Sequence, residues 1–153
     1  MTTDLQLPPP GGSRIVLSST KSDSHTWNLV YLQLLLEEAG HEVANLGACV
    51  PPDLLADECA ALRPDLVVLS TVNGHGYQDG PRALAALRER PDLMATPVVI
   101  GGKLGTGGPE PARADALRAT GFTDVFDDDT AVPRFRAFLA ALTPALCAAG
   151  SPS

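Results

Sequence analysis

The apolar residues of this chain alternate between two spacings, which predict short strands followed by helices. Compact apolar runs predict strands over 14–19, 41–47, 66–70, 97–102 and 123–126. Apolar positions three or four residues apart predict helices over 25–39, 51–63, 80–90, 112–120 and 131–146. Gly40 and Gly121 stand where two of these helices end, a position that favours glycine. The third strand begins with four apolar residues in succession, which is typical of a central strand buried on both faces.

Five rounds of strand and helix without an internal repeat predict a single α/β domain. Because crossovers between parallel strands are right-handed, the expected fold is an open, doubly wound parallel sheet with helices on both faces. We expect the strand order 2-1-3-4-5 of flavodoxin-like and Rossmann-like sheets, in which ligands bind beyond the carboxyl ends of the first, third and fourth strands. The domain is assigned to 14–146, with a disordered leader over 1–13 and a flexible tail over 147–153.

Composition narrows the class of protein. Hydrophobic residues make up 44% of the 153 positions but aromatic residues only 5%, so the core must consist mainly of Leu, Val and Ala. The net charge of −7 argues against binding to nucleic acid or to an anionic membrane surface. No apolar run reaches the length of a membrane span. Three widely spaced cysteines, and a leader without the features of a signal peptide, indicate a cytoplasmic protein.

The unusual residues fall in three loops that the predicted topology brings to one edge of the sheet. Asp23 and His25 follow the first strand, and the carboxylate can hold the imidazole in one tautomer, leaving the other nitrogen free for a metal or a proton. Such a triplet alone is more typical of a polar loop with a helix cap. Residues 70–76 follow the third strand, and Gly101-Gly102 ends the fourth. Three such loops together indicate a binding site.

Several ligand classes are disfavoured by what these loops lack. There is no GxxxxGK[ST] sequence, and no GxGxxG follows the first strand. A receiver domain would carry an acidic cluster after the first strand and a lysine after the fifth, whereas Lys21 lies in the first loop and Asp127 begins an acidic run late in the chain. A flavodoxin needs aromatic residues against its flavin, and Tyr77 is the only aromatic residue nearby.

Taken together, the motifs resemble the cobalamin (B12)-binding domain family, and within it the small cobalamin-binding subunits of glutamate mutase. The resemblance runs from about residue 15 to about residue 142. It rests on Ser22–His25, Glu38–Val43, Asn45–Gly47, Pro52, Ser70, Gly74-x-Gly76, Gly101-Gly102 and Gly121-Phe122.

The resemblance implies a role for each matching residue. In that family a histidine replaces the cofactor's own dimethylbenzimidazole as the lower axial ligand of cobalt, and the nucleotide tail enters a slot between the sheet and the first helix. His25 would then be the cobalt ligand, with Asp23 as the partner that orients it. The cofactor contacts expected on this basis come from Asp23, Ser24, His25, Thr26, Asn28, Ser70, Val72, Asn73, Gly74, Gly101, Gly102, Lys103 and Thr130.

The other histidines fit the ligand role less well. His41 precedes the second strand at the opposite edge of the sheet, where we expect an exposed polar residue. His75 lies at the correct edge but has no carboxylate two residues away. The chain also departs from the family pattern Asp-x-His-x-x-Gly, because Asn28 occupies the glycine position. Asn28 either narrows the slot, or caps the first helix and hydrogen-bonds the tail.

The resemblance implies that this chain is the cofactor-binding subunit of an isomerase. Such a subunit is inactive alone. A separate large catalytic subunit would bind the substrate and cover adenosylcobalamin, whose cobalt–carbon homolysis begins a carbon-skeleton rearrangement. No catalytic residue is assigned to this chain, and neither nucleic acid nor membrane is an expected partner. Two alternatives remain: a corrinoid carrier for methyl transfer, or a degenerate domain that has lost the cofactor and serves as a binding or regulatory module.

Overall fold

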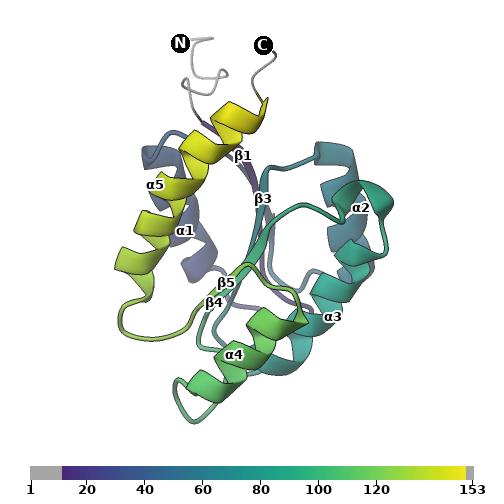
Figure 1. Cartoon of the computed structure of the whole chain (residues 1–153). Helices are drawn as coiled ribbons and strands as arrows, with labels where there is room; N and C mark the ends of the chain where they lie inside the picture. The colour runs from purple at the N-terminus through teal and green to yellow at the C-terminus, as the bar shows by residue number, and fades with distance from the viewer. Residues whose placement is uncertain (1–11, 151–153) are drawn as a thin grey trace.

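The computed structural model describes residues 12–150, and among them the side chains up to residue 142. Strands and helices alternate along the whole of this range (Figure 1). The strands are β1 (Arg14–Ser18), β2 (Glu42–Gly47), β3 (Leu66–Thr71), β4 (Val98–Gly102) and β5 (Asp124–Phe126). The helices are α1 (Trp27–Glu38), α2 (Pro52–Leu62), α3 (Gly76–Arg88), α4 (Pro111–Thr120) and α5 (Ala131–Gly150), with a short 3₁₀ helix, η2 (Pro91–Leu93).

The sheet has the predicted topology. Its five strands are ordered β2-β1-β3-β4-β5, and every neighbouring pair is parallel. The chain order therefore reverses between β1 and β3, so the loops after these strands diverge to opposite sides and leave room for a ligand between them. All three loops singled out in the sequence lie at this carboxyl edge.

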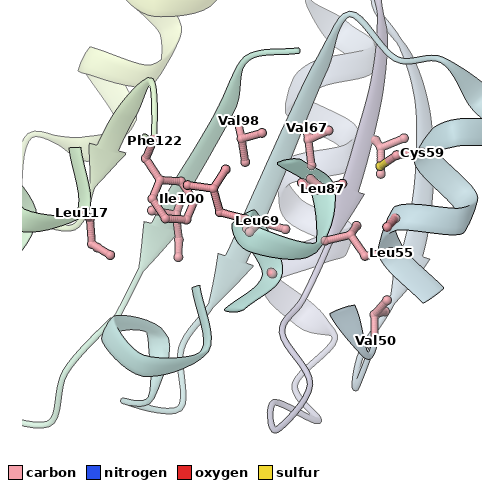
Figure 2. Close-up of a cluster of buried hydrophobic side chains, with 14 of the residues drawn as sticks. Val50, Leu55, Cys59, Val67, Leu69, Leu87, Val98, Ile100, Leu117 and Phe122 are labelled. Atoms are coloured by element: carbon pink, nitrogen blue, oxygen red, sulfur yellow. The ribbon is translucent and has the colours of Figure 1, made fainter. Parts of the chain in front are cut away.

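Each face of the sheet has its own hydrophobic core. The core between the sheet and helices α2, α3 and α4 contains Leu69, Ile100, Leu55, Leu87 and Leu117 (Figure 2). The core on the opposite face lies under α1 and α5, which cover that side of the sheet together (Figure 1). Strand residues alternate between the two, as the pleat of a sheet requires.

The helix boundaries lie within two residues of those predicted, except for two that differ by four residues. α3 begins at Gly76 rather than at residue 80, although Pro81 then lies inside the helix and removes one backbone donor. Tertiary contacts explain the early start: Gly76 packs closely against Leu104, and the hydroxyl of Tyr77 donates to Asp127 at 3.0 Å. α5 continues to Gly150, four residues past the predicted end. Of the predicted leader over 1–13 and tail over 147–153, residues 1–11 and 151–153 lie outside the described residues.

Two further sequence expectations concern membranes and cysteines. Among the described residues, no helix is both long and apolar enough to cross a membrane. Cys59 is fully buried in the core beside α2, where burial, aided by the nearby Glu58 charge, raises the pKa of its thiol to about 12. The thiolate does not form at neutral pH, so this cysteine acts as a small apolar core residue.

Candidate functional site

The loop between β1 and α1 places a buried carboxylate beside a half-exposed imidazole. Asp23 is completely buried, whereas 47% of the His25 side chain is exposed. Nδ1 of His25 lies 2.6 Å from Oδ1 of Asp23, and the backbone N–H of His25 donates to the same oxygen at 2.9 Å. These two contacts fix the direction of the ring. Nε2 has no partner within the described part of the chain, so it is the nitrogen available to a ligand.

The second oxygen of Asp23 joins this loop to the loop after β3. Oδ2 accepts a hydrogen bond from the hydroxyl of Thr71 at 2.6 Å and another from the backbone N–H of Val72 at 2.7 Å. The hydroxyl of Thr20 in turn lies 3.2 Å from that of Thr71. The carboxylate therefore fixes the relative positions of the loops on the two sides of the switch point.

These hydrogen bonds keep Asp23 ionised. Burial acts to raise its pKa, but the hydrogen bonds from Thr71, from the backbone of His25 and Val72, and from the His25 ring outweigh it and lower the pKa to about 2. An ionised carboxylate can only accept, so the proton in the short contact belongs to Nδ1 of His25. Nε2 then carries a lone pair, which suits it to bind a metal or to accept a proton.

A pocket of about 290 Å³ opens beside this pair, between α1, α5 and the carboxyl half of the sheet. Most of its wall is apolar. The sheet contributes Val68 and Val99, α1 contributes Leu35, and α5 contributes Phe135. The exposed rings of Trp27 and Tyr31 also line it, as do Asn28, Leu32, Leu69, Ser70, Val72, Ile100, Gly101, Gly102, Phe126, Asp127, Asp128, Ala131 and Val132. The sequence expectation of a slot between the sheet and the first helix thus has a physical counterpart.

Asn28 lies in the wall of this pocket without closing it. The residue is 5% exposed, and its Nδ2 donates to Oγ of Ser70 at 2.8 Å. It is the second residue of α1, and Thr26 holds the cap position, so the expectation that Asn28 caps the helix is wrong. The side chain folds inward because the hydroxyl of Ser70 offers a buried partner.

The two glycines at the end of β4 are required by the sheet itself. At Gly102 the backbone φ is +115°, and a Cβ would lie 2.1 Å from the carbonyl oxygen of Thr71. At Gly101 a Cβ would lie 2.8 Å from the carbonyl oxygen of Phe126. Both residues also line the pocket, so their small size leaves space there as well.

The remaining predicted contact residues spread around the same edge. Asn73 accepts from the backbone of His75 and donates to Ser22 at 3.0 Å. Gly74 donates its N–H to the carbonyl of Lys103, whose side chain is exposed. Lys103 lines a second hollow of about 390 Å³, which shares Val72, Gly102, Asp127 and Asp128 with the first.

Seven of the thirteen predicted contact residues line neither hollow, and Asp23 and His25 are among them. Ser24 and Thr26 are exposed in the β1–α1 loop, and Thr26 makes no capping hydrogen bond through its side chain. Thr130 directly precedes α5, but its hydroxyl donates to Asp128 at 2.6 Å, and the residue lines neither hollow.

Sequence reasoning missed Thr71 and misjudged His41. Thr71 holds the buried oxygen of Asp23, and only its position between two predicted contact residues pointed to it. His41 is 6% exposed rather than exposed, and its Nδ1 accepts from the backbone N–H of Ser13 at 3.1 Å. Burial lowers the pKa of His41 and so favours its neutral form. Its polar sequence neighbours gave no sign of this burial or of the hydrogen bond from the residue that precedes β1.

Several known sequences are similar to this chain over most of its length. The family model described as the B12 binding domain matches residues 13–135. Glutamate mutase sigma subunit 1 of Haloarcula marismortui is 29% identical over 119 residues, which is 76% of each chain. The glutamate mutase sigma subunit of Halobacterium salinarum is 35% identical over 97 residues, 61% of each chain.

A third relative is named for a different function. The HTH-type transcriptional repressor CarA of Myxococcus xanthus is 35% identical over 100 residues, which is 65% of this chain. The match spans only 34% of the length of CarA.

Solved structures show how widely the fold is shared. A cobalamin-binding protein from Desulfitobacterium hafniense superposes with a TM-score of 0.67 at 21% identity, over 84% of this chain and 59% of the other. A response regulator from Desulfuromonas acetoxidans superposes with a TM-score of 0.63 at 17% identity, over 87% of this chain and 98% of the other. At these identities the likeness concerns the fold alone, and the residues of the loops must distinguish the functions.

Proposed function

Because the chain belongs to the B12-binding domain family, we propose that it is the cobalamin-binding subunit of an adenosylcobalamin-dependent carbon-skeleton mutase of the glutamate mutase type. Two sigma subunits of glutamate mutase, at 29% and 35% identity, support the mutase class. The observation that carries the proposal is the Asp23–His25 pair, which leaves one imidazole nitrogen free and fixes its direction.

The residues present fit a cobalamin in three respects. Nδ1 of His25 is engaged by a buried carboxylate, so Nε2 is available to cobalt. The adjoining pocket is largely apolar and so suits the benzimidazole base. Asn28 brings to the pocket wall a buried oxygen that has no hydrogen-bond partner within residues 12–150. Such an oxygen is stabilised by a ligand that carries a donor.

This chain would bind and orient rather than react. His25 would bind cobalt through Nε2, and the negative charge of Asp23 would raise the basicity of that nitrogen through the proton on Nδ1. Val72 and Thr71 hold Asp23 in place, so the two loops support one ligand together. When bound, adenosylcobalamin supplies radical chemistry by homolysis of its cobalt–carbon bond. Substrate binding is assigned to a separate large catalytic subunit.

The ligand assignment is tested by electron paramagnetic resonance of the cob(II)alamin form. Uniformly ¹⁵N-labelled protein is combined with unlabelled cofactor. The axial nitrogen splitting is expected to change from a triplet to a doublet, because the ligand nitrogen then comes from the protein. His25→Ala is expected to abolish the doublet, whereas His75→Ala retains it. A triplet that persists with labelled protein would mean that dimethylbenzimidazole stays on cobalt, and the proposal would be wrong.

The mutase class is tested separately, with a glutamate mutase large subunit as the partner. The chain alone with adenosylcobalamin is expected to form no 3-methylaspartate from glutamate, and addition of the large subunit is expected to start turnover. Turnover by the chain alone would refute the need for a partner. Absence of turnover with every glutamate mutase large subunit tried, while His25 still ligates cobalt, would argue against the mutase class.

A second candidate function is a cobalamin-responsive binding module. The 35% identity to CarA over 100 residues favours it, since CarA is named a transcriptional repressor. The same cobalamin site would then regulate association with a partner and support no reaction. A corrinoid carrier for methyl transfer remains a third candidate, supported only by the fold it shares with a monomethylamine corrinoid protein of Methanosarcina barkeri, TM-score 0.68 at 15% identity.

A further inference from the structure

Among the described residues, buried polar side chains occur at one place in the wall of the pocket between α1 and α5. Of the described residues that line it, Asn28 and Ser70 are the two polar ones that are buried, at 5% and 3% exposure. The wall deeper in the sheet is formed by apolar residues such as Val68, Val99 and Phe135. A ligand that enters this pocket therefore meets one polar position between its mouth and its apolar base.

The hydrogen bonds of this pair are incomplete. Nδ2 of Asn28 donates to Oγ of Ser70 at 2.8 Å, but Oδ1 of Asn28 is buried without a partner among residues 12–150. The hydroxyl proton of Ser70 likewise has no acceptor in that range. The pair thus offers one acceptor and one donor side by side. A buried acceptor left unpaired costs free energy, and a suitable ligand group would recover it.

A third polar group lies next to this pair. β1 and β3 are in register with Ser18 beside Leu69, so Ser19 and Ser70 follow side by side at the carboxyl ends of these strands. Alternation along the strands places both on the face covered by α1. Oγ of Ser19 is also buried without a partner within the described residues, and the residue is 1% exposed. Within the described residues, the two unpartnered buried side-chain atoms thus belong to this face of the sheet, although Ser19 does not line the pocket.

A hydroxyl complements one donor and one acceptor at a single atom. A phosphate carries acceptors only, so it would suit Ser70 but be repelled by Oδ1 of Asn28. A benzimidazole base has no N–H to donate once it is attached to ribose. In a corrinoid tail, the hydroxyls of the ribose both donate and accept.

We propose that Asn28 is a specificity-determining residue, which together with Ser70 binds a ribose hydroxyl of the corrinoid's nucleotide tail. This inference rests on the proposed cobalamin site. It gives the departure from the family's glycine a positive role: the amide adds a contact that a glycine at this position does not offer. The chain then favours corrinoids whose tail carries this hydroxyl.

Asn28 could either bind the tail or simply narrow the slot. The two roles predict opposite changes in the affinity for hydroxocobalamin when Asn28 is substituted. If the amide binds the tail, Asn28→Ala and Asn28→Gly weaken the binding of hydroxocobalamin about tenfold, the usual scale for one lost hydrogen bond that leaves its partner buried. If the amide only obstructs, both changes tighten binding, and the proposal is overturned. Binding is measured by absorbance titration of the purified full chain.

Cobinamide, which lacks the nucleotide tail, serves as the control ligand. Its affinity is expected to be the same for the wild type and both Asn28 variants. The matched control variant is Asn45→Ala, because Asn45 is a hydrogen-bonded, part-buried asparagine that does not line the pocket. That control is expected to leave both affinities unchanged. An equal loss for hydroxocobalamin and cobinamide in the Asn28 variants would indicate a general structural effect and overturn the proposal.

Deoxyribose analogues test the contact directly. Hydroxocobalamins lacking the 2′-hydroxyl or the 5′-hydroxyl of the ribose are titrated against the wild type and Asn28→Ala. One analogue is expected to bind about tenfold more weakly to the wild type and to show no such loss with Asn28→Ala. Equal losses in both proteins, or no loss with either analogue, would overturn the inference but leave the cobalamin site intact. Failure of the wild type to bind hydroxocobalamin at all would overturn both.

Discussion

The two faces of the sheet are built from the same strands but are packed differently. On the face covered by α2, α3 and α4, the carboxyl halves of β3 and β4 present Leu69 and Ile100, and these fill the space under the helices (Figure 2). On the face covered by α1 and α5, the next residues in the same strands are Ser70 and Gly101. Small residues at these two positions leave the pocket of about 290 Å³ open.

This difference shows how one sheet can hold both a stable core and a binding site. The filled face contributes burial of large apolar side chains, which stabilises the fold. The open face gives up part of that burial, and its core also includes residues such as Ile15 and Leu66, which do not line the pocket. We therefore expect substitutions on the filled face to change stability most, and those on the open face to change ligand binding most.

The largest expected effect on stability is that of Leu87→Ala on the filled face. Leu87 is 1% exposed, and its loss leaves a closed cavity, so the free energy of unfolding should fall by about 2–5 kcal/mol. Leu35→Ala, in the wall of the open pocket, should lower the free energy of unfolding by about 2 kcal/mol. This value is at the lower end of that range, because the pocket already leaves one side of Leu35 unpacked. Urea denaturation of both variants measures the difference. Equal losses would contradict the comparison.

Asp23→Asn is expected to have the next largest effect. Its folded pKa of about 2 lies below the usual value of 3.8, so ionised Asp23 stabilises the fold by roughly 2 kcal/mol at neutral pH. The sign follows from the lowered pKa: this stabilisation is complete above the unfolded pKa and is lost as the pH falls through the folded one. Wild type and variant should therefore differ at pH 7 and converge between about pH 4 and pH 2. A difference independent of pH in denaturation curves would exclude this account.

For cobalamin, Asp23→Asn should weaken affinity about 10–100-fold, the usual effect of losing the partner of a metal-binding histidine. Absorbance titration with hydroxocobalamin measures it. The variant should retain some binding, because His25 itself is still present, whereas His25→Ala should lose axial ligation altogether.

Added volume should be tolerated differently on the two faces. Gly76→Ala would place a Cβ 3.1 Å from the Cα of Leu104 and 2.9 Å from Cγ2 of Thr71, so we expect a loss of about 1–3 kcal/mol. Val68→Ile adds one carbon on the face that contains the pocket, so the free energy of unfolding should fall by less than about 1 kcal/mol. The same change should weaken cobalamin binding, because it fills part of the pocket. Thermal denaturation and titration of both variants check the pair. The opposite order of stabilities would mean that the pocket is not open to added volume.

Trp27→Phe should have the smallest effect on stability, within about 0.5 kcal/mol, because Trp27 is 64% exposed at the rim of the pocket. Trp27 is the single tryptophan of the chain, so its fluorescence reports on that rim alone. Hydroxocobalamin should quench the emission of the wild type in a saturable way. Emission that does not respond to saturating cofactor would show that the ligand lies elsewhere.

Local spacing was sufficient to predict the order of elements, the sheet topology and the edge at which the site lies. Apolar periodicity distinguishes strands from helices, and the handedness of crossovers then leaves few arrangements. The close pairing of Asp23 and His25 also follows from sequence, since two residues separated by one position in a loop can meet without help from the rest of the fold. The B12-binding resemblance rested on the same local motifs.

Contacts between residues far apart in the chain were decided only by the tertiary structure. Thr71 holds Asp23 across 48 positions, and Asn28 turns toward Ser70 across 42, so neither partner is visible from spacing. The hydrogen bond between Ser13 and the buried His41, and the early start of α3, have the same origin. A hydrogen bond or a packed contact depends on where the folded sheet brings two atoms together, whereas periodicity records only which face of its own element a residue occupies.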